Sequence, residues 1–360
     1  MPPGSAPGTS PDMQDHVRTW LQQRTSHWQD WPLERLLAAK RAAGTRISVV
    51  IPARNEERTV GRVVAALRQA LLTATPLVDE IIVVDSDSTD GTARAAERAG
   101  AVVHRARDIA PALGSYPGKG EALWKSLLVT QGDLLVFVDA DLTRWGPHFV
   151  TGLLGPLLAD PPGPGRQGDG QQGDGQQGDG QQGDGQPVQL VKGFYERVRT
   201  ERDGSTSTEG GRVTELVARP LLSLWWPQLA GVVQPLAGEW AIRRGLMESL
   251  SIPVGYGVEL STLLDTFTRY GLGALAQVDL GSRAHRHQAD HDLALMAAEL
   301  LVVAEARREH PEQPGQLLHQ FVRENGGARA RSRAIPSHER PPASTVKAAR
   351  SGRPGEGGVR

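Results

Sequence analysis

The chain has 360 residues, with 40 lysines and arginines against 41 aspartates and glutamates, and a formal net charge of −1. This balance argues against a general nucleic-acid binder, because such proteins usually carry a strongly basic domain. The sequence contains no cysteine, which excludes disulfides, thiol catalysis and cysteine-ligated metal sites.

Three segments have the composition of unfolded chain, and they hold much of the excess of glycine (42) and proline (25). Residues 1–16 are rich in proline, glycine and serine. Residues 161–186 repeat Gln-Gly-Asp-Gly with a period of five and offer no apolar position to bury. Residues 326–360 are basic and rich in glycine, proline and alanine. We expect a disordered N-terminus, a low-complexity surface insertion and a disordered basic tail.

No part of the sequence predicts a membrane span. The most apolar window, residues 221–242, is interrupted by Pro227, Pro235 and Glu239. The first residues lack the apolar core of a signal peptide. We therefore expect a cytoplasmic protein that interacts with neither membranes nor nucleic acid.

Between these segments, apolar strands alternate with helical patterns. The predicted strands cover residues 46–51, 80–84, 101–104 and 134–138, and the predicted helices cover residues 60–71, 89–100 and 120–129. Asn55 is a candidate cap for the first of these helices. Uninterrupted apolar strands alternating with helices indicate an α/β fold with a mainly parallel sheet. In such sheets ligands bind at the carboxyl ends of the strands.

Two carboxylates, Asp139 and Asp141, directly follow the strand at 134–138. Their hard oxygen ligands suit Mg²⁺, with Mn²⁺ as a substitute, and such an ion could bridge diphosphate oxygens. A strand-end turn is the alternative, because aspartate is also common there.

Two other strand ends carry polar groups. Asp85 and Ser86 could bind a base or ribose hydroxyls, and the backbone of Pro52 and Ala53, together with Glu56, could contact a nucleotide. Turn and helix-capping chemistry is the alternative for these loops.

Two cationic residues lie beside glycines at predicted helix starts. Lys119, between two glycines, is well placed for a phosphate, although the spacing is not that of a P-loop. Gly211, Arg212 and Thr214 form a candidate nest for a phosphate or carboxylate of a second substrate. A solvated lysine and a capped helix with a surface arginine are the alternatives.

A probable strand at 276–280 leads to Arg283, His285 and His287, which strand alternation would place on one side. An imidazole there could complete a metal site with a distant carboxylate, and Arg283 could bind an anion. Surface basic residues are the alternative. Glu259 follows the glycine-rich Gly-Tyr-Gly-Val, which favours close approach of a ligand but is explained equally well by a turn.

At these residues the sequence resembles the glucosyl-3-phosphoglycerate synthases of actinobacteria, which are GT-A-type glycosyltransferases. The matching motifs include Val-Val-Ile-Pro-Ala-x-Asn-Glu-Glu, Pro-Gly-Lys-Gly-Glu-Ala-Leu-Trp, Val-Phe-Val-Asp-x-Asp-Leu and Gly-Gly-Arg-Val-Thr-Glu-Leu-Val-Ala-Arg-Pro-Leu. The resemblance covers roughly residues 45 to 325, apart from the insertion. It implies a Rossmann-like nucleotide-sugar-binding half at 17–160 and an acceptor-binding half, helical towards its C-terminus, at 187–325.

The resemblance further implies transfer of glucose from UDP-glucose to the 2-hydroxyl of 3-phosphoglycerate, with retention at the anomeric carbon, Mg²⁺ as cofactor and a homodimer. The implied donor contacts are Pro52, Ala53, Glu56, Ser86, Lys119, Asp139, Asp141 and Glu259. The implied metal ligands are Asp141 and His285, and the implied acceptor contacts are Gly211, Arg212, Thr214, Arg283 and His287. Leu236 matches the position whose backbone lies closest to the reacting sugar, so Asp141, Lys119 and Leu236 are the expected catalytic residues.

Two positions depart from the family pattern. The chain has Asp-Ala-Asp where relatives often have Asp-Ser-Asp, and His287 where they commonly have asparagine. No residue stands out as a covalent nucleophile, which favours attack from the same face as the departing diphosphate. Three other functions stay open: a mannosyltransferase that uses GDP-mannose on the same acceptor, a sugar-phosphate nucleotidyltransferase and a non-catalytic sugar-nucleotide-binding protein.

Overall fold

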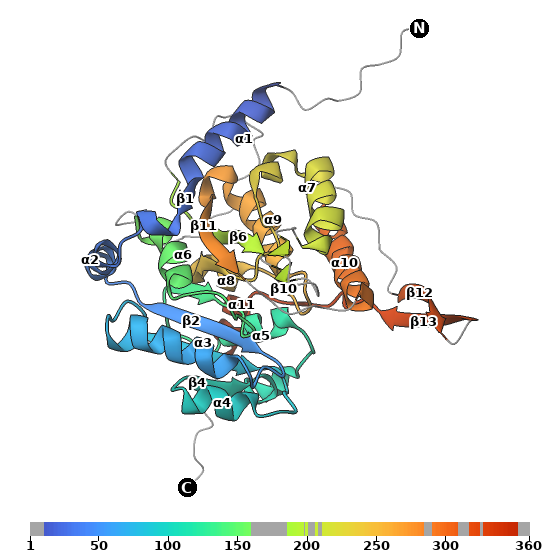
Figure 1. Cartoon of the computed structure of the whole chain (residues 1–360), viewed down its shortest axis with the longest axis horizontal. Helices are drawn as coiled ribbons and strands as arrows, with labels where there is room; N and C mark the ends of the chain where they lie inside the picture. Colours follow the sequence, from blue (N-terminus) through green and yellow to red (C-terminus); the bar gives the residue numbers. More distant parts are fainter. Residues whose placement is uncertain are drawn as a thin grey trace.

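The computed structural model describes residues 11–159, 186–197, 199–200, 206–207, 211–283, 290–308, 317–324 and 327–351. Helices flank a central eight-stranded sheet (Figure 1). Its strands, from one edge to the other, are β1 (Thr25–His27), β11 (Leu275–Arg283), β6 (Leu190–Arg197), β9 (Trp240–Arg243), β5 (Leu134–Phe137), β2 (Ile47–Ala53), β3 (Glu80–Asp85) and β4 (Val102–Arg105). All neighbouring strands are parallel except β9, which is antiparallel to both β5 and β6. The predicted α/β fold with a mainly parallel sheet is confirmed.

The described helices are α1 (Pro11–Arg24), α2 (Leu33–Ala43), α3 (Val60–Leu67), α4 (Thr92–Arg98), α5 (Lys119–Ser126), α6 (His148–Ala159), α7 (Arg219–Trp225), α8 (Arg244–Ser249), α9 (Val258–Tyr270), α10 (Asp290–Glu305) and α11 (Ala343–Ser351). The described residues also form two π-helical segments. η2 (Arg68–Thr73) extends α3, and η5 (Thr214–Ala218) leads into α7. The remaining strand pairs are β10 (Ile252–Pro253) with β14 (Glu339–Arg340), β12 (Leu317–Glu324) with β13 (Gly327–Ala334), and β7 (Arg199–Thr200) with β8 (Thr206–Ser207).

Strand β2 shows why the apolar runs form the centre of the sheet. Its side chains alternate between two faces, and both faces are buried. Val49 packs in the core cluster that contains Val63 of α3, whereas Val50 packs in the cluster that contains Trp124 of α5. The helix predicted at 60–71 is confirmed as α3 and η2. Asn55 does not cap it, because α3 begins at Val60 and Asn55 lies in a left-handed turn with φ of 57°.

The second half of the chain completes the same sheet. It supplies β6, β9 and β11, and the short N-terminal strand β1 pairs with β11 at the far edge. The strands from both halves therefore position one continuous carboxyl edge.

The described residues near both ends of the chain form more regular structure than the sequence predicts. Helix α1 begins at Pro11, and its Trp20 is buried and donates its indole N–H to the carbonyl of Leu275 at 3.0 Å. The expected disordered tail is wrong for residues 327–351, which form β13, β14 and α11. Arg340 is 6% exposed and Ala343 is fully buried, because partners distant in sequence stabilise this segment. Most of the predicted insertion lies outside the described residues.

Among the described residues, no helix is both long and apolar enough to cross a bilayer.

Candidate active site

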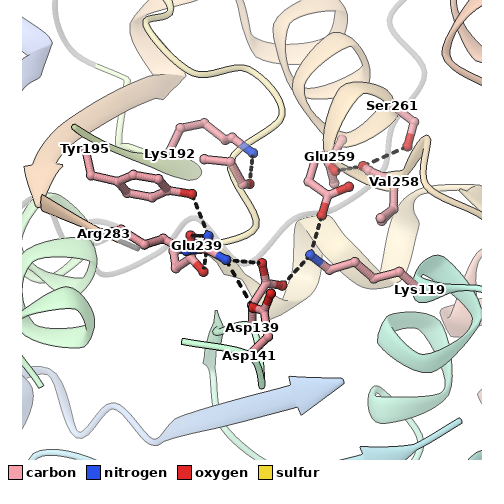
Figure 2. Close-up of polar contacts among 12 residues, drawn as sticks. Lys119, Asp139, Asp141, Lys192, Tyr195, Glu239, Val258, Glu259, Ser261 and Arg283 are labelled. Atoms are coloured by element: carbon pink, nitrogen blue, oxygen red, sulfur yellow. Dashed lines mark hydrogen bonds and ion pairs between the residues drawn. The ribbon is translucent and has the colours of Figure 1, made fainter. Parts of the chain in front are cut away.

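Charged side chains from several elements gather at the carboxyl edge of the sheet. Asp139 and Asp141 follow β5, and Arg283 is the last residue of β11. Glu239 precedes β9, and because β9 runs antiparallel its beginning lies at the edge where its neighbours end. We call Lys119, Asp139, Asp141, Glu239, Glu259 and Arg283 the charged cluster (Figure 2).

Lys119 bridges two of the carboxylates. It is the first residue of α5, and its Nζ lies 2.6 Å from Oδ1 of Asp139 and 2.7 Å from Oε1 of Glu259, the second residue of α9. Burial alone would lower the pKa of Lys119, but the two carboxylates outweigh it and hold the pKa well above its usual value. Lys119 is therefore a fixed positive charge at a helix N-terminus, which favours anions.

Arg283 links the other carboxylates. Its Nη1 lies 2.6 Å from Glu239 Oε2 and donates to the Tyr195 hydroxyl at 2.6 Å. Its Nη2 lies 3.2 Å from both Asp139 Oδ2 and Asp141 Oδ1. Glu239 is fully buried, so Arg283 is the ion-pair partner that this carboxylate requires.

Burial and charge set different proton affinities for these carboxylates. Burial would raise the pKa of Asp139, but Lys119 and Arg283 lower it far below its usual value. Burial and the charge of Asp139 raise the pKa of Asp141. Burial also raises the pKa of Glu239, against the charge of Arg283. The nearby cations thus outweigh the effect of burial on the pKa of Asp139, but they do not outweigh burial and the charge of Asp139 at Asp141.

A divalent cation fits this arrangement. Asp139 and Asp141 offer hard oxygen donors, their side chains are 22% and 28% exposed, and the pair lacks full charge compensation. No group of three histidines or carboxylates close enough to hold a metal occurs among the described residues. The predicted ligand His285 lies outside them, as does His287.

The turn at residues 236–238 packs closely against Asp139 of the charged cluster. An added Cβ at Gly238 would overlap the Asp139 carboxylate, so only glycine fits there. Lys192 of β6 fixes the same turn, because its Nζ donates to the carbonyl of Ala237 at 2.9 Å. Leu236, the first residue of this turn, is partly buried and packs against the hydrophobic core.

The strand ends β2 and β3 form the neighbouring part of the edge. Ala53 pairs with Asp85, and the amide of Ser86 donates to the carbonyl of Ala53 at 2.9 Å, so Pro52, Ala53 and Ser86 lie together. The carboxylate of Glu56 accepts a bond from Thr59 at 3.0 Å.

The predicted acceptor nest lies at the start of the helical segment that runs through η5 into α7. Thr214 is buried, and Gly211 accepts a backbone bond from Glu215 at 3.0 Å. No contact described for Gly211 or Thr214 joins them to the charged cluster, so the role of Gly211, Arg212 and Thr214 stays a prediction.

Comparison with known proteins assigns the family. Residues 48–179 match the model of glycosyl transferase family 2. The glucosyl-3-phosphoglycerate synthase of Mycolicibacterium smegmatis is 41% identical over 328 residues, which cover 91% of this chain and 98% of that protein. The chain belongs to the glucosyl-3-phosphoglycerate synthase family.

Solved structures of Mycobacterium tuberculosis glucosyl-3-phosphoglycerate synthase support this assignment. The complex of that enzyme with Mn²⁺, UDP-glucose and phosphoglyceric acid has a TM-score of 0.74 at 40% identity and covers 91% of this chain and 99% of its own. The complex with Mg²⁺ and UDP has a TM-score of 0.73 at 40% identity and covers 90% and 99%. The Mycobacterium tuberculosis enzyme therefore binds a divalent cation together with the uridine nucleotide.

The sequence predicts most residues of the charged cluster, but not Glu239 or the two residues of β6, Lys192 and Tyr195, that hold the turn and the arginine beside it. The structure brings together the predicted Lys119, Asp139, Asp141, Glu259 and Arg283. In the sequence, Glu239 is apparent only as a charge that interrupts the apolar window at residues 221–242. One feature of the sequence does point to this region. Lys192 lies inside the apolar run Leu-Val-Lys-Gly-Phe-Tyr, and a buried lysine requires a hydrogen-bond or ion-pair partner.

Proposed function

We propose that this chain transfers glucose from UDP-glucose to the 2-hydroxyl of 3-phosphoglycerate and releases UDP. The observation that carries the proposal is the charged cluster, in which Lys119 and Arg283 face paired carboxylates at the carboxyl edge of a family 2 glycosyltransferase fold. Membership of the synthase family supports the choice of donor and acceptor.

Lys119, Asp139 and Asp141 of the cluster act at the leaving diphosphate. Lys119 supplies a permanently protonated ammonium at the N-terminus of α5, and Asp139 holds it in place. Asp141, with His285, would hold Mg²⁺ or Mn²⁺, which when bound supplies positive charge to the diphosphate oxygens. These groups stabilise the negative charge that develops as the bond from glucose C1 to the diphosphate breaks.

We propose that the reaction retains the anomeric configuration without a covalent enzyme intermediate. The acceptor oxygen bonds to C1 as the diphosphate leaves from the same face, and the leaving oxygen takes the acceptor proton. Glu239 is fully buried and Glu259 is 6% exposed, and each is paired with a cation, so neither is free to attack the sugar. Intact-mass spectra without a glucosylated protein would fit this route, and a trapped adduct would contradict it.

The acceptor carries a phosphate and a carboxylate and requires a cationic, donor-rich pocket. We assign this role to Gly211, Arg212 and Thr214, with Arg283 and His287, in the acceptor-binding half at 187–325. Arg212→Ala is expected to raise the KM for 3-phosphoglycerate about tenfold or more while changing the KM for UDP-glucose little. An unchanged acceptor KM would remove Arg212 from the site.

The deciding experiment incubates the protein with MgCl₂, 3-phosphoglycerate and, in separate reactions, UDP-glucose and GDP-mannose. We expect glucosyl-3-phosphoglycerate by mass, and the anomeric proton coupling of the product in NMR should show that the α linkage of the donor is retained. A mannosyl product would replace the donor assignment. A third reaction contains UTP and glucose 1-phosphate: pyrophosphate released there, without any glycosylated acceptor in the other two, would favour a nucleotidyltransferase and overturn the proposal.

We also propose that the protein is a homodimer and acts in the cytoplasm. Leu216 of η5 and Leu224 of α7, eight residues further along, expose 74% and 75% of their surface, and the neighbouring Trp225 exposes 39%. Exposed apolar residues grouped in this way are typical of an association surface. Light scattering after size exclusion would give about twice the 38.7 kDa chain mass, and Leu224→Arg would reduce it.

A further inference from the structure

Three segments that are distant in sequence, around residues 118–121, 252–255 and 338–340, meet at the start of α5, the helix that carries Lys119. The amides of Gly120 and Glu121 donate to the carbonyls of Gly255 and Val254 at 3.0 and 2.9 Å. The amide of Val254 donates in turn to the carbonyl of His338 at 3.2 Å, where β10 pairs with β14. An added Cβ at Gly118 or Gly120 would overlap the backbone of residues 253–254, so the first two segments are in direct contact.

Arg340 joins the third segment to the helix that carries Lys119. Its Nε and Nη2 donate to the two carboxylate oxygens of Glu121 at 2.8 and 2.7 Å, a bidentate pair. Its Nη1 and Nη2 also donate to the carbonyls of Leu113 and Gly114 at 2.8 and 3.2 Å. All three nitrogens of the guanidinium therefore bind α5 or the loop that leads into it.

Aromatic side chains enclose this contact. The guanidinium carbon of Arg340 lies 4.6 Å from the centroid of the Tyr116 ring and 4.9 Å from that of Trp124. The Trp124 indole donates to the carbonyl of Pro341 at 2.8 Å. Arg340 is 6% exposed and Glu121 is 1% exposed, so the pair is shielded from water.

The position of this pair matters because Glu121 is two residues from Lys119. The ammonium of Lys119 must stay between Asp139 and Glu259, which lie on two other elements. Loss of Arg340 would leave the buried Glu121 carboxylate with Lys125, at 3.4 Å, as its remaining ion-pair partner, and would free the loop before α5. A shift of about 1 Å at a binding group is enough to lower turnover by about 100-fold.

We propose that Arg340 is a positioning residue for the donor site, which acts through Glu121 to fix the N-terminus of α5 and hence Lys119. The inference rests on the proposed function, in which Lys119 contacts the donor diphosphate. The C-terminal segment at residues 338–343 then supports the donor site from behind α5, because none of its described side chains contacts the charged cluster directly.

The test compares Arg340→Met and Arg340→Lys with the full-length wild type. Methionine keeps an unbranched side chain against Trp124 but cannot make the bidentate pair, and lysine keeps the charge with a single contact. Lys347→Ala is the matched control, because Lys347 follows the 338–343 segment in α11 and its ion pair with Glu248, at 2.5 Å, joins α11 to α8 and not to α5.

Calorimetry gives the dissociation constants of UDP, with MgCl₂ present, and of 3-phosphoglycerate. In Arg340→Met we expect weaker UDP binding by about tenfold or more and a fall of about 10- to 100-fold in kcat/KM for UDP-glucose. The affinity for 3-phosphoglycerate should change less than about twofold, Arg340→Lys should recover part of the loss, and Lys347→Ala should match the wild type in all three measurements.

Other outcomes would overturn the inference. A lower melting temperature or fewer binding sites, with an unchanged UDP dissociation constant per site, would show that Arg340 only stabilises the fold. Equal losses of UDP and 3-phosphoglycerate affinity would exclude a donor-specific role. If Arg340→Met does not fold, Arg340→Lys must still weaken UDP binding more than 3-phosphoglycerate binding. A wild type that makes no glucosylated product defeats the proposed function, whereas an active wild type with unaffected variants defeats only this inference.

Discussion

Different interactions stabilise the two sides of the carboxyl edge of the sheet. Neutral hydrogen bonds join the loops around Asn55 on the β2–β3 side, and ion pairs join the residues on the β5–β11 side. On the β2–β3 side, Asn55 joins the two strand-end loops through neutral groups: its backbone amide donates to Ser88 Oγ at 2.9 Å, and its Oδ1 accepts from the Thr89 amide at 2.8 Å. On the β5–β11 side, Lys119 and Arg283 form ion pairs with four buried or half-buried carboxylates.

We expect this difference to separate recognition of the donor nucleoside from stabilisation of the developing charge. Neutral, exposed hydrogen bonds suit an uncharged base and ribose, and they contribute modestly to binding. Buried charges cost free energy to desolvate, but water and salt screen them little, so they act strongly on a charge that develops nearby. Variants on the β5–β11 side should therefore have much larger effects than variants on the β2–β3 side.

The largest effect is expected from Asp141→Ala. Loss of the carboxylate that would hold the divalent cation should lower kcat at saturating MgCl₂ by about 1,000-fold or more. The control is Asp87→Asn on the β3 side, where the carboxylate is 50% exposed and pairs with Arg107. That variant should stay within about twofold of wild-type turnover. Asp141→Ala with wild-type activity would contradict the assignment.

Arg283→Met tests the cost of the buried charges themselves. It leaves Glu239 fully buried without its ion pair, so the free energy of unfolding should fall by about 3–5 kcal/mol. The exposed Arg107→Met should change it by less than about 1 kcal/mol. Urea denaturation of both variants measures the contrast, and equal losses would remove the distinction between the two sides.

Lys192 makes the β5–β11 side sensitive to pH. Burial lowers the pKa of Lys192 to about 7 in the folded protein. Between this value and the unfolded pKa of about 10.4, the unfolded chain binds one more proton, so stability should rise with pH by about 1.4 kcal/mol per unit. Below pH 7 both states are protonated and the slope vanishes. Urea titrations from pH 6 to 9.5 should show this slope in the wild type relative to Lys192→Met; parallel curves would refute it.

The smallest effect is expected on the β2–β3 side. Asn55→Gly removes the bonds to Thr89 but tolerates the left-handed backbone, so the KM for UDP-glucose should rise about two- to tenfold with little change in kcat. Asn55→Ala adds backbone strain of about 1–2 kcal/mol and should be worse. A fall in kcat as large as that of Asp141→Ala would place charge stabilisation on both sides of the edge.

The sequence predicted the elements whose signals are local. The strand at 134–138 and the carboxylates after it placed Asp139 and Asp141 at the carboxyl edge, because parallel strands align their ends. Glycines beside Lys119 marked the start of α5. Each of these inferences needed only a short stretch of chain.

The rest depended on pairings between distant residues. Glu239 reaches the edge only because β9 runs antiparallel between β5 and β6, and the order of strands is not written in any one segment. Arg340 lies in a stretch with the composition of disordered chain, and its partner Glu121 is 219 residues away. Local composition could not show that a buried carboxylate elsewhere would stabilise this segment.

The antiparallel strand β9 also sets an order of assembly during synthesis. Strands β2 to β5 can pair with one another as soon as residues 47–137 have emerged, since each has a partner within that stretch. Strand β6 emerges next, but both of its partners, β9 and β11, come later in the chain. Until they arrive, β6 has two unpaired edges that other strands could join, so the nascent protein is most prone to aggregation in this interval.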